Sequence, residues 1–194
     1  MTNKATPPPS DFLLPHKEPG TELLATYGAH SHDKLLIHYG FVPTTCPDPD
    51  DSIPLDPYLL PHIPETTKTQ LQDTGYLAHY HLTPAENFSL CHRTEVAVRG
   101  VLLACNEWEY FVGSGEDLGE DATGRVRAWL APVLREGARD AGVKAREVGE
   151  SDVGDVVARG LVTERWGQIC RALGGWVERF GGGEWSGAAS EMEE

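Results

Sequence analysis

Two pairs of histidines have a spacing that is compatible with metal binding. His30 and His32 are separated by one residue, as are His79 and His81, so both members of a pair would face the same side of an extended segment. A protein metal site needs at least one further ligand close in space, usually Asp, Glu, Cys or His. The sequence alone brings no such ligand near either pair. Packing or surface roles are the simpler interpretation, and we predict no metal site.

Nucleophilic chemistry can be considered at Cys91, which is followed directly by His92. Neighbours in a strand point to opposite faces, so this thiol and this imidazole would not pair with each other. The cysteines are widely spaced and form no Cys-x-x-Cys motif, which disfavours a disulfide framework or a zinc site. They are Cys46, Cys91, Cys105 and Cys170. Free thiols in a reducing compartment are the simplest interpretation.

Composition limits the classes of function. The 194 residues have a net charge of -14 and are 40% hydrophobic, enough for one compact domain, or for a small domain plus part of another. No basic stripe is present, which disfavours nucleic-acid binding. No apolar run approaches the roughly 18 residues of a membrane span, and the polar, proline-rich N-terminus lacks the pattern of a signal peptide. We predict an intracellular protein, cytoplasmic or nuclear, with no membrane partner. The acidity suits a basic protein partner, or it only maintains solubility.

The first third of the sequence predicts little regular structure. Five prolines lie within residues 1–19, and seven more lie within residues 43–64, where they oppose helix formation. Between these stretches we expect a short strand over residues 23–27 and a helix over residues 32–39. Ser31 can cap the start of that helix, and Gly40 can end it.

The remainder is predicted to be mainly helical. Apolar residues recur at spacings of three and four in its longest patterns, as in amphipathic helices. Pro132 lies inside one of these patterns, so a kink or a late helix start is expected there. The expected elements are a strand at 52–55, a helix at 65–74, a hairpin over 76–90, one helix through 97–111, a helix around 126–134 and a helix over 156–180. The predicted fold class is mainly α (α+β), with a small β element towards the N-terminus.

The stretch from Gly20 to Val42 is the most informative part of the sequence, and it reads GTELLATYGAHSHDKLLIHYGFV. It contains a glycine turn, an acidic residue before two apolar residues, a Tyr-Gly pair, a helix that begins near a serine, and a closing Tyr-Gly-Phe. In order and spacing, residues 21–42 resemble the C-terminal end of SET-type protein-lysine methyltransferases. The variant is that of the Rubisco large-subunit methyltransferase group.

This resemblance implies roles for three aromatic residues. It makes Tyr27 the catalytic tyrosine, while Tyr39 and Phe41 line the cofactor or lysine channel. Methyl transfer from a sulfonium to an amine needs in-line alignment and exclusion of water. A phenol hydroxyl can orient the amine, and aromatic rings form a narrow apolar channel. Judged by residue type alone, each of the three can equally serve packing.

A second resemblance extends over residues 65–180. Tyr80–Pro84 and Cys91–Arg99 are similar to the hairpin and first long helix of the helical substrate-binding domain of the same group, and Leu161–Leu173 is similar to a later helix. The resemblance implies a protein substrate bearing a target lysine, and S-adenosyl-L-methionine as cofactor. It also implies two regions, the end of a SET-like domain with a linker (20–64) and the substrate-binding domain (65–180). Composition predicts an irregular proline-rich N-terminus (1–19) and a disordered acidic tail (181–194).

The cofactor-contacting segments of the family are a glycine-containing loop and an Asn-His-Ser-type segment, both upstream of the part that matches here. In this sequence residues 1–19 precede the match, and they contain no Asn-His pair. We therefore expect the C-terminal portion of a protein-lysine N-methyltransferase that is catalytically incomplete alone. The alternative is a non-catalytic protein-binding module derived from the substrate-binding domain.

Overall fold

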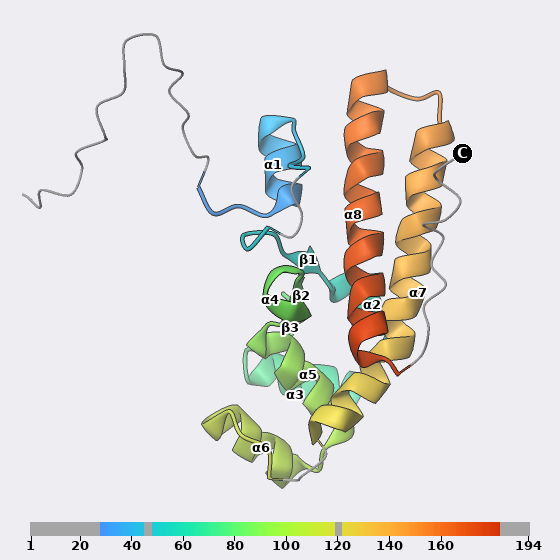
Figure 1. Ribbon diagram of the computed structural model, residues 1–194. Helices are drawn as coiled ribbons and strands as arrows, with labels where there is room; N and C mark the ends of the chain where they lie inside the picture. Colours follow the sequence, from blue (N-terminus) through green and yellow to red (C-terminus); the bar gives the residue numbers. More distant parts are fainter. Residues whose placement is uncertain (1–27, 45–47, 119–121, 183–194) are drawn as a thin grey trace, which may run out of the picture.

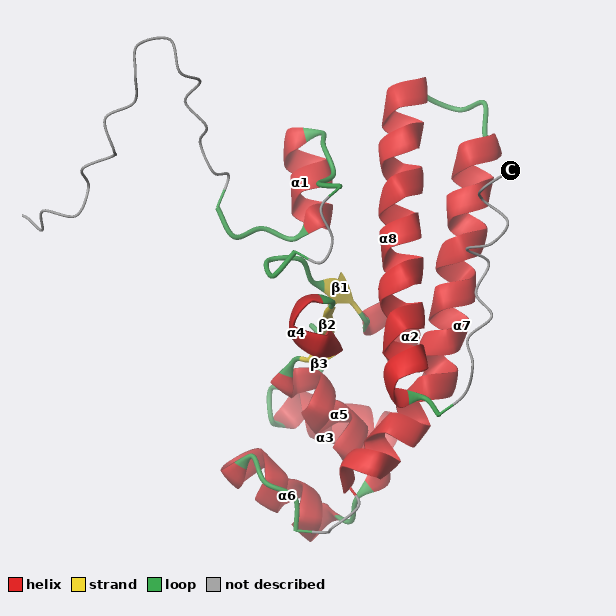
Figure 2. Ribbon diagram, in the orientation of Figure 1, coloured by secondary structure: helices red, strands yellow, loops and turns green. Residues whose placement is uncertain are grey.

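The computed structural model describes residues 28–44, 48–118 and 122–182. This part of the chain is mainly helical with a small antiparallel sheet, as predicted for the fold class (Figure 1, Figure 2). The long helices α7 (Ala122–Glu150) and α8 (Val156–Phe180) lie side by side, and the other elements are arranged along one side of this pair. No helix in the described ranges is both long and apolar enough to cross a membrane.

The shorter elements include several that the sequence predicts. In chain order they are α1 (His32–Tyr39), β1 (Ile53–Pro54), α2 (Asp56–Leu59), the 3-10 turn η1 (Leu60–His62), α3 (Glu65–Asp73), β2 (His81–Thr83), α4 (Ala85–Phe88), β3 (Ser89–Leu90), α5 (His92–Leu102) and α6 (Cys105–Ser114). The helices expected at 32–39 and 65–74 are confirmed, as is a strand within 52–55. The strand expected at 23–27 lies outside the described residues.

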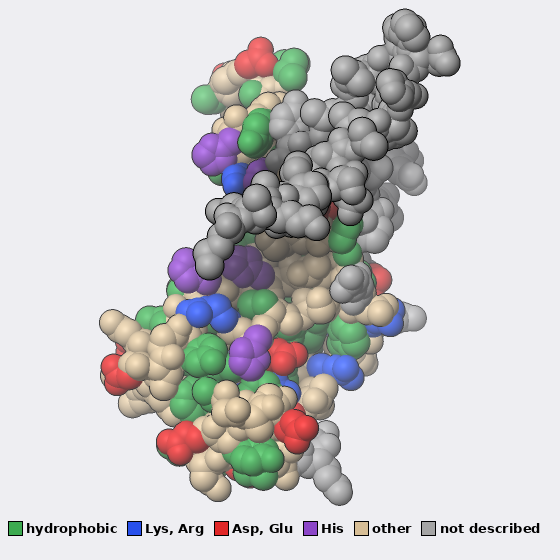
Figure 3. All heavy atoms as spheres, turned by 90° about the vertical axis from the view of Figure 1, so that its left-hand side faces the viewer, with side chains coloured by type: hydrophobic (Ala, Val, Ile, Leu, Met, Phe, Trp, Pro, Cys, Tyr) green, Lys and Arg blue, Asp and Glu red, His purple; other side chains and the backbone are tan. Residues whose placement is uncertain are grey.

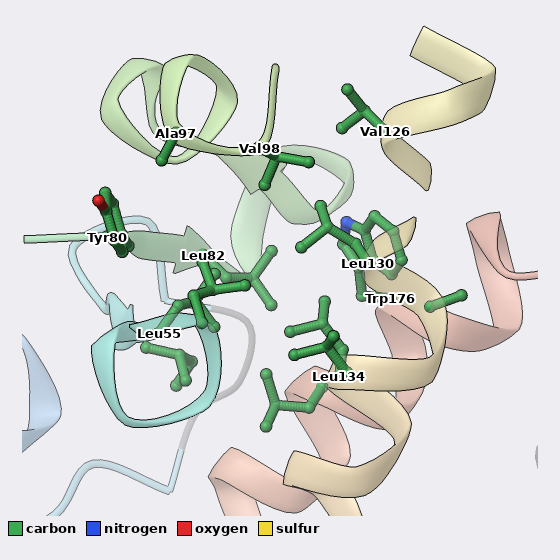
Figure 4. Close-up of a cluster of buried hydrophobic side chains, with 14 of the residues drawn as sticks. Leu55, Tyr80, Leu82, Ala97, Val98, Val126, Leu130, Leu134 and Trp176 are labelled. Atoms are coloured by element: carbon green, nitrogen blue, oxygen red, sulfur yellow. The ribbon is translucent and has the colours of Figure 1, made fainter. Parts of the chain in front are cut away.

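A hydrophobic cluster joins the sheet, α5 and the two long helices. Figure 4 shows Leu55 and Leu82 facing Leu130, Leu134 and Trp176, and all five side chains are at most 2% exposed. Burial of each large apolar side chain contributes about 1.5–3 kcal/mol to stability. Residues on both sides of position 64 belong to this cluster, while the division of the chain into domains stays a prediction.

Helix α7 passes through Pro132 without interruption, so the late helix start considered for this segment is wrong. Proline has no backbone N–H, and the carbonyl of Ala128 therefore loses its partner in the helix. Figure 1 shows the first turns of α7 inclined to the rest of the helix, as expected for a proline kink.

The single helix expected through residues 97–111 is instead two helices, α5 and α6. Leu103 and Ala104 between them are extended, with ψ values of 158° and 155°. The buried indole of Trp108 donates a 2.9 Å hydrogen bond to the carbonyl of Val96. In a continuous helix these residues would be about 18 Å apart along the axis, so the chain must turn back to form this contact.

The predicted hairpin is present but shorter than expected. Strands β2 and β3 pair antiparallel, with Leu82 opposite Leu90, and α4 forms the connection. The first strand, expected from residue 76, begins only at His81. The carboxylate of Asp56 accepts the backbone N–H groups of His79 and Tyr80 at 2.9 and 2.8 Å, so these N–H groups do not pair with a neighbouring strand.

Substitution of Gly137 by alanine is predicted to destabilise the protein. A Cβ at Gly137, on α7, would lie 2.9 Å from the Tyr58 ring on α2, so the ring must shift at a cost of about 1–3 kcal/mol. Gly160→Ala on α8 is the control, because its Cβ would meet no heavy atom within 4 Å. That variant should gain about 0.5–1 kcal/mol from helix propensity. Urea unfolding measures both values, and equal stabilisation by the two alanines would contradict the packing argument.

Candidate functional site

Helix α1 carries the centre of the SET-like stretch and lies beside α8 (Figure 1). Ser31 caps its start, since the Ser31 hydroxyl accepts the Lys34 N–H at 3.4 Å. Gly40 ends it in the left-handed conformation, with φ of 72°, and donates to the carbonyl of Leu36. The expected helix boundaries and both caps are therefore confirmed.

The predicted channel residues lie around the C-terminal end of α1. Tyr27 is outside the described residues. The Tyr39 side chain is 46% exposed, and its ring stacks on His30 with 6.3 Å between ring centroids. Phe41 is partly buried and follows the Gly40 turn. Ile37 is 76% exposed, so the described residues do not enclose a cofactor at this end of α1. They do not by themselves fit S-adenosyl-L-methionine.

A group of buried and half-buried polar side chains joins α1 to α8, and we call it the α1–α8 polar cluster. Its members are His32, Asp33, Asp48, Asp51, Arg165 and Gln168. The sequence patterns do not predict this group, although His32 belongs to one of the two histidine pairs whose spacing is compatible with metal binding. The cluster connects positions as far as 136 residues apart in the chain.

Arg165 is the central cation of the α1–α8 polar cluster and is 3% exposed. Its Nε and Nη2 donate to the two carboxylate oxygens of Asp33 at 2.8 and 3.0 Å, and its Nη1 donates to Asp51 at 2.8 Å. Burial by itself lowers the pKa of a guanidinium, but the hydrogen bonds from Asp33 and Asp51 raise the pKa of Arg165 above its ordinary value. Arg165 therefore remains charged and holds both carboxylates.

His32 is fully buried, and both of its ring nitrogens face oxygen atoms. Nδ1 lies 2.8 Å from Gln168 Oε1, and Nε2 lies 3.1 Å from Asp48 Oδ2. The Gln168 amide is oriented by its nitrogen, which donates to the carbonyl of Pro43 at 2.8 Å. The imidazolium form can donate to both oxygens, whereas a neutral ring can donate to only one of them.

The chemistry of the α1–α8 polar cluster is that of a structural junction. Arg165 and His32 are buried, and each is surrounded by hydrogen-bond partners from other segments. Charges removed from water are stable only when paired in this way. A group so enclosed holds two elements together.

One sequence signal points to the α1–α8 polar cluster. Arg165 lies four residues before Ile169 and eight before Leu173, so it continues the buried stripe of α8. A charged residue on an apolar stripe needs a buried partner. The identity of that partner could not be read from the sequence, because Asp33 and Asp51 are more than one hundred residues away.

Histidines are spread over the face that carries α1 and the sheet, as Figure 3 shows. His32 belongs to the α1–α8 polar cluster, while His79 is held in the left-handed conformation with φ of 61°. Within the described ranges, no three His, Cys, Asp or Glu side chains are grouped so that they could hold a metal ion. The described cysteines, at positions 91, 105 and 170, are free thiols.

Removal of Arg165 is predicted to release α1 from α8. Arg165→Met leaves Asp33 and Asp51 without their cation, and loss of one member of a buried pair costs about 3–5 kcal/mol. Hydrogen exchange at the α1 amides should accelerate, and urea unfolding should give the lost stability.

Arg171→Met is the matched control for this experiment. Arg171 pairs with Glu164 on the exposed surface of the same helix, where an ion pair is worth at most about 1 kcal/mol. Unchanged α1 exchange in Arg165→Met, or equal effects of the two variants, would contradict the assigned role of the cluster.

Comparisons with known proteins do not assign this chain to a family. No protein-family model matches the sequence. Neither the curated proteins nor the solved structures that were compared with it give a match. The similarity to SET-type methyltransferases therefore rests on the sequence motifs themselves, and the activity that it implies is a proposal.

Proposed function

We propose that this chain is the C-terminal portion of an S-adenosyl-L-methionine-dependent protein-lysine N-methyltransferase of the Rubisco large-subunit methyltransferase group. One observation carries the proposal. The α1–α8 polar cluster connects the two stretches whose sequences resemble this group independently. His32 and Asp33 come from the SET-like stretch, and Arg165 and Gln168 come from the stretch Leu161–Leu173.

This connection has a physical consequence for substrate binding. In the proposal, residues 20–44 supply one wall of the lysine channel, while residues 65–180 hold the substrate protein. A target lysine must enter the channel in a fixed geometry, because misplacement of the reacting atoms by about 1 Å can reduce the rate a hundredfold. The bidentate contact between the buried Arg165 guanidinium and Asp33 fixes the orientation of α1 relative to residues 65–180.

The proposed roles of the aromatic residues follow from their side-chain chemistry. The hydroxyl of Tyr27 orients the lysine amine, and the rings of Tyr39 and Phe41 line the channel and exclude water. S-adenosyl-L-methionine, which the family holds with segments upstream of the matching stretch, would supply the methyl group as a sulfonium. Tyr39 is exposed, and this supports a position where a substrate or another part of the enzyme covers its ring.

Tyr27→Phe is predicted to abolish methyl transfer, because it removes the hydroxyl that orients the amine. The natural full-length protein is purified and incubated with tritium-labelled S-adenosyl-L-methionine. An extract of cells that do not produce this protein supplies the substrates. Label on lysine is then identified by mass spectrometry. We expect the rate to fall by at least about a hundredfold, the scale of a lost orienting group.

Tyr110→Phe is the control, because Tyr110 lies on α6 and its side chain is 43% exposed. This variant should retain the parental rate. Equal activity of Tyr27→Phe and the parent would refute the role of Tyr27. Absence of lysine methylation by a parent that contains the upstream cofactor segments would refute the enzyme proposal, and absence of those segments from the natural protein would favour the protein-binding module.

A further inference from the structure

An open pocket of about 210 Å³ lies between α4, β3, α5, α7 and α8. Tyr39 and Phe41 do not line it, so it is separate from the proposed lysine channel. Its walls combine aromatic rings with charged side chains. The aromatic residues are Phe88, Trp176 and Phe180, and the charged residues are Arg99, Arg127 and Glu95. Two guanidinium groups in one pocket contrast with the net charge of -14 of the whole chain.

Arg99 is a buried cation with an unused hydrogen-bond donor. Its side chain is 6% exposed, and its Nε and Nη2 donate to Asp117 at 2.7 and 2.8 Å. Nη1 is buried and has no hydrogen-bond partner, since Glu95 approaches it only to 3.8 Å. Arg99 and Glu95 both line the pocket, whereas Asp117 does not. A buried N–H without an acceptor is costly, so an acceptor oxygen there would be stabilising.

Arg127 is the second cation of the pocket. Its guanidinium carbon lies 4.6 Å from the centre of the Phe180 ring, and this stacking orients the group. Across the described ranges, no carboxylate forms a salt bridge with Arg127, so its donors are available to a ligand. Thr123, one turn earlier on α7, also lines the pocket and offers a hydroxyl.

The backbone that carries part of the pocket's apolar wall is strained. Asn87 and Phe88 both have left-handed backbone conformations, with φ of 70° and 59°, which are unfavourable for residues other than glycine. The Phe88 ring rests on the backbone of α8 at Gly175, where a Cβ would lie 2.7 Å from the ring. Strain of this kind is often retained where a side chain is held for binding.

We propose that this pocket binds a carboxylate attached to an apolar, ring-sized group. The carboxylate accepts hydrogen bonds from Arg99 and Arg127, and the ring packs against Phe88 and Phe180. A cavity of about 150 Å³ is sufficient for benzene, so this pocket admits a phenyl group with a short acid chain but no folded segment. Glu95 competes with the ligand for Arg99. The proposal does not depend on methyltransferase activity.

The first experiment is an NMR titration of the purified chain with 3-phenylpropionate. Saturable shifts at Phe88, the Trp176 indole and Phe180 are expected, and the neutral analogue 3-phenylpropanol should bind at least about tenfold more weakly, the scale of one charge-assisted hydrogen bond. Equal binding of acid and alcohol, or no saturable shift at these residues, would overturn the proposal.

A pair of peptides distinguishes a free acid from the end of a protein chain. Gly-Gly-Phe with a free carboxylate is compared with the same peptide amidated at its C-terminus. Binding of the free-carboxylate peptide at the affinity of 3-phenylpropionate or better supports a protein C-terminus as the ligand. Binding of 3-phenylpropionate without binding of either peptide supports a free small acid.

Three variants test which side chains recognise the carboxylate. Arg127→Gln should weaken 3-phenylpropionate binding by about tenfold. Arg179→Gln is the matched control, because Arg179 also lies near the Phe180 ring, at 5.6 Å, but does not line the pocket. The Arg179→Gln variant should bind 3-phenylpropionate within about twofold of the parent affinity, since exposed charges outside a site contribute little.

Glu95→Gln should strengthen the binding of 3-phenylpropionate by removing the competing carboxylate. Equal losses in both arginine variants, or weaker binding by Glu95→Gln, would contradict the assignment.

Discussion

The buried guanidinium of Arg165 is the constraint on which the arrangement of the N-terminal elements depends. Its removal from water is tolerated because its donors reach Asp33 on α1, Asp51 before β1 and Gln168 on α8 itself. These acceptors come from three segments, so the segments must assemble together for the charge to be satisfied. The α1–α8 polar cluster therefore makes the position of α1 depend on the folding of α8. A purely apolar contact would specify the position of α1 less sharply, because it lacks the directionality of charge-assisted hydrogen bonds.

Helix α8 connects two sites with different chemistry. Arg165 and Gln168 lie in its N-terminal half, whereas Trp176 and Phe180, near its C-terminal end, line the pocket that we propose binds a carboxylate. The rise of an α-helix places Arg165 and Trp176 about 17 Å apart. Substitutions separated by more than about 7–10 Å usually act additively, so effects on α1 docking and on ligand binding should be separable. The core that packs α7 on α8 supports both sites.

Local sequence patterns predicted the parts of the fold that local interactions determine. Helix α1 followed from Ser31, Gly40 and the spacing between them, and α8 from its apolar stripe. The break at Leu103 was missed although Gly100 lies three residues before it, because the tertiary contact between Trp108 and Val96 decides where the helix ends. The polar cluster and the pocket were missed for a related reason. Their members lie far apart in the sequence, and periodicity carries no information about which distant residues meet.

Gln168 constrains the position of the segment that contains two of the proposed channel residues. Its amide oxygen faces the His32 ring at the start of α1, and its amide nitrogen donates to the Pro43 carbonyl beyond the end of that helix. One side chain thus contacts both ends of the segment that contains Tyr39 and Phe41. Because Gly40 reverses the chain between these two aromatic residues, their relative positions are set by α1 and by the Pro43 contact together. The position of the proposed channel wall is therefore a property of its junction with α8, and not of the SET-like stretch alone.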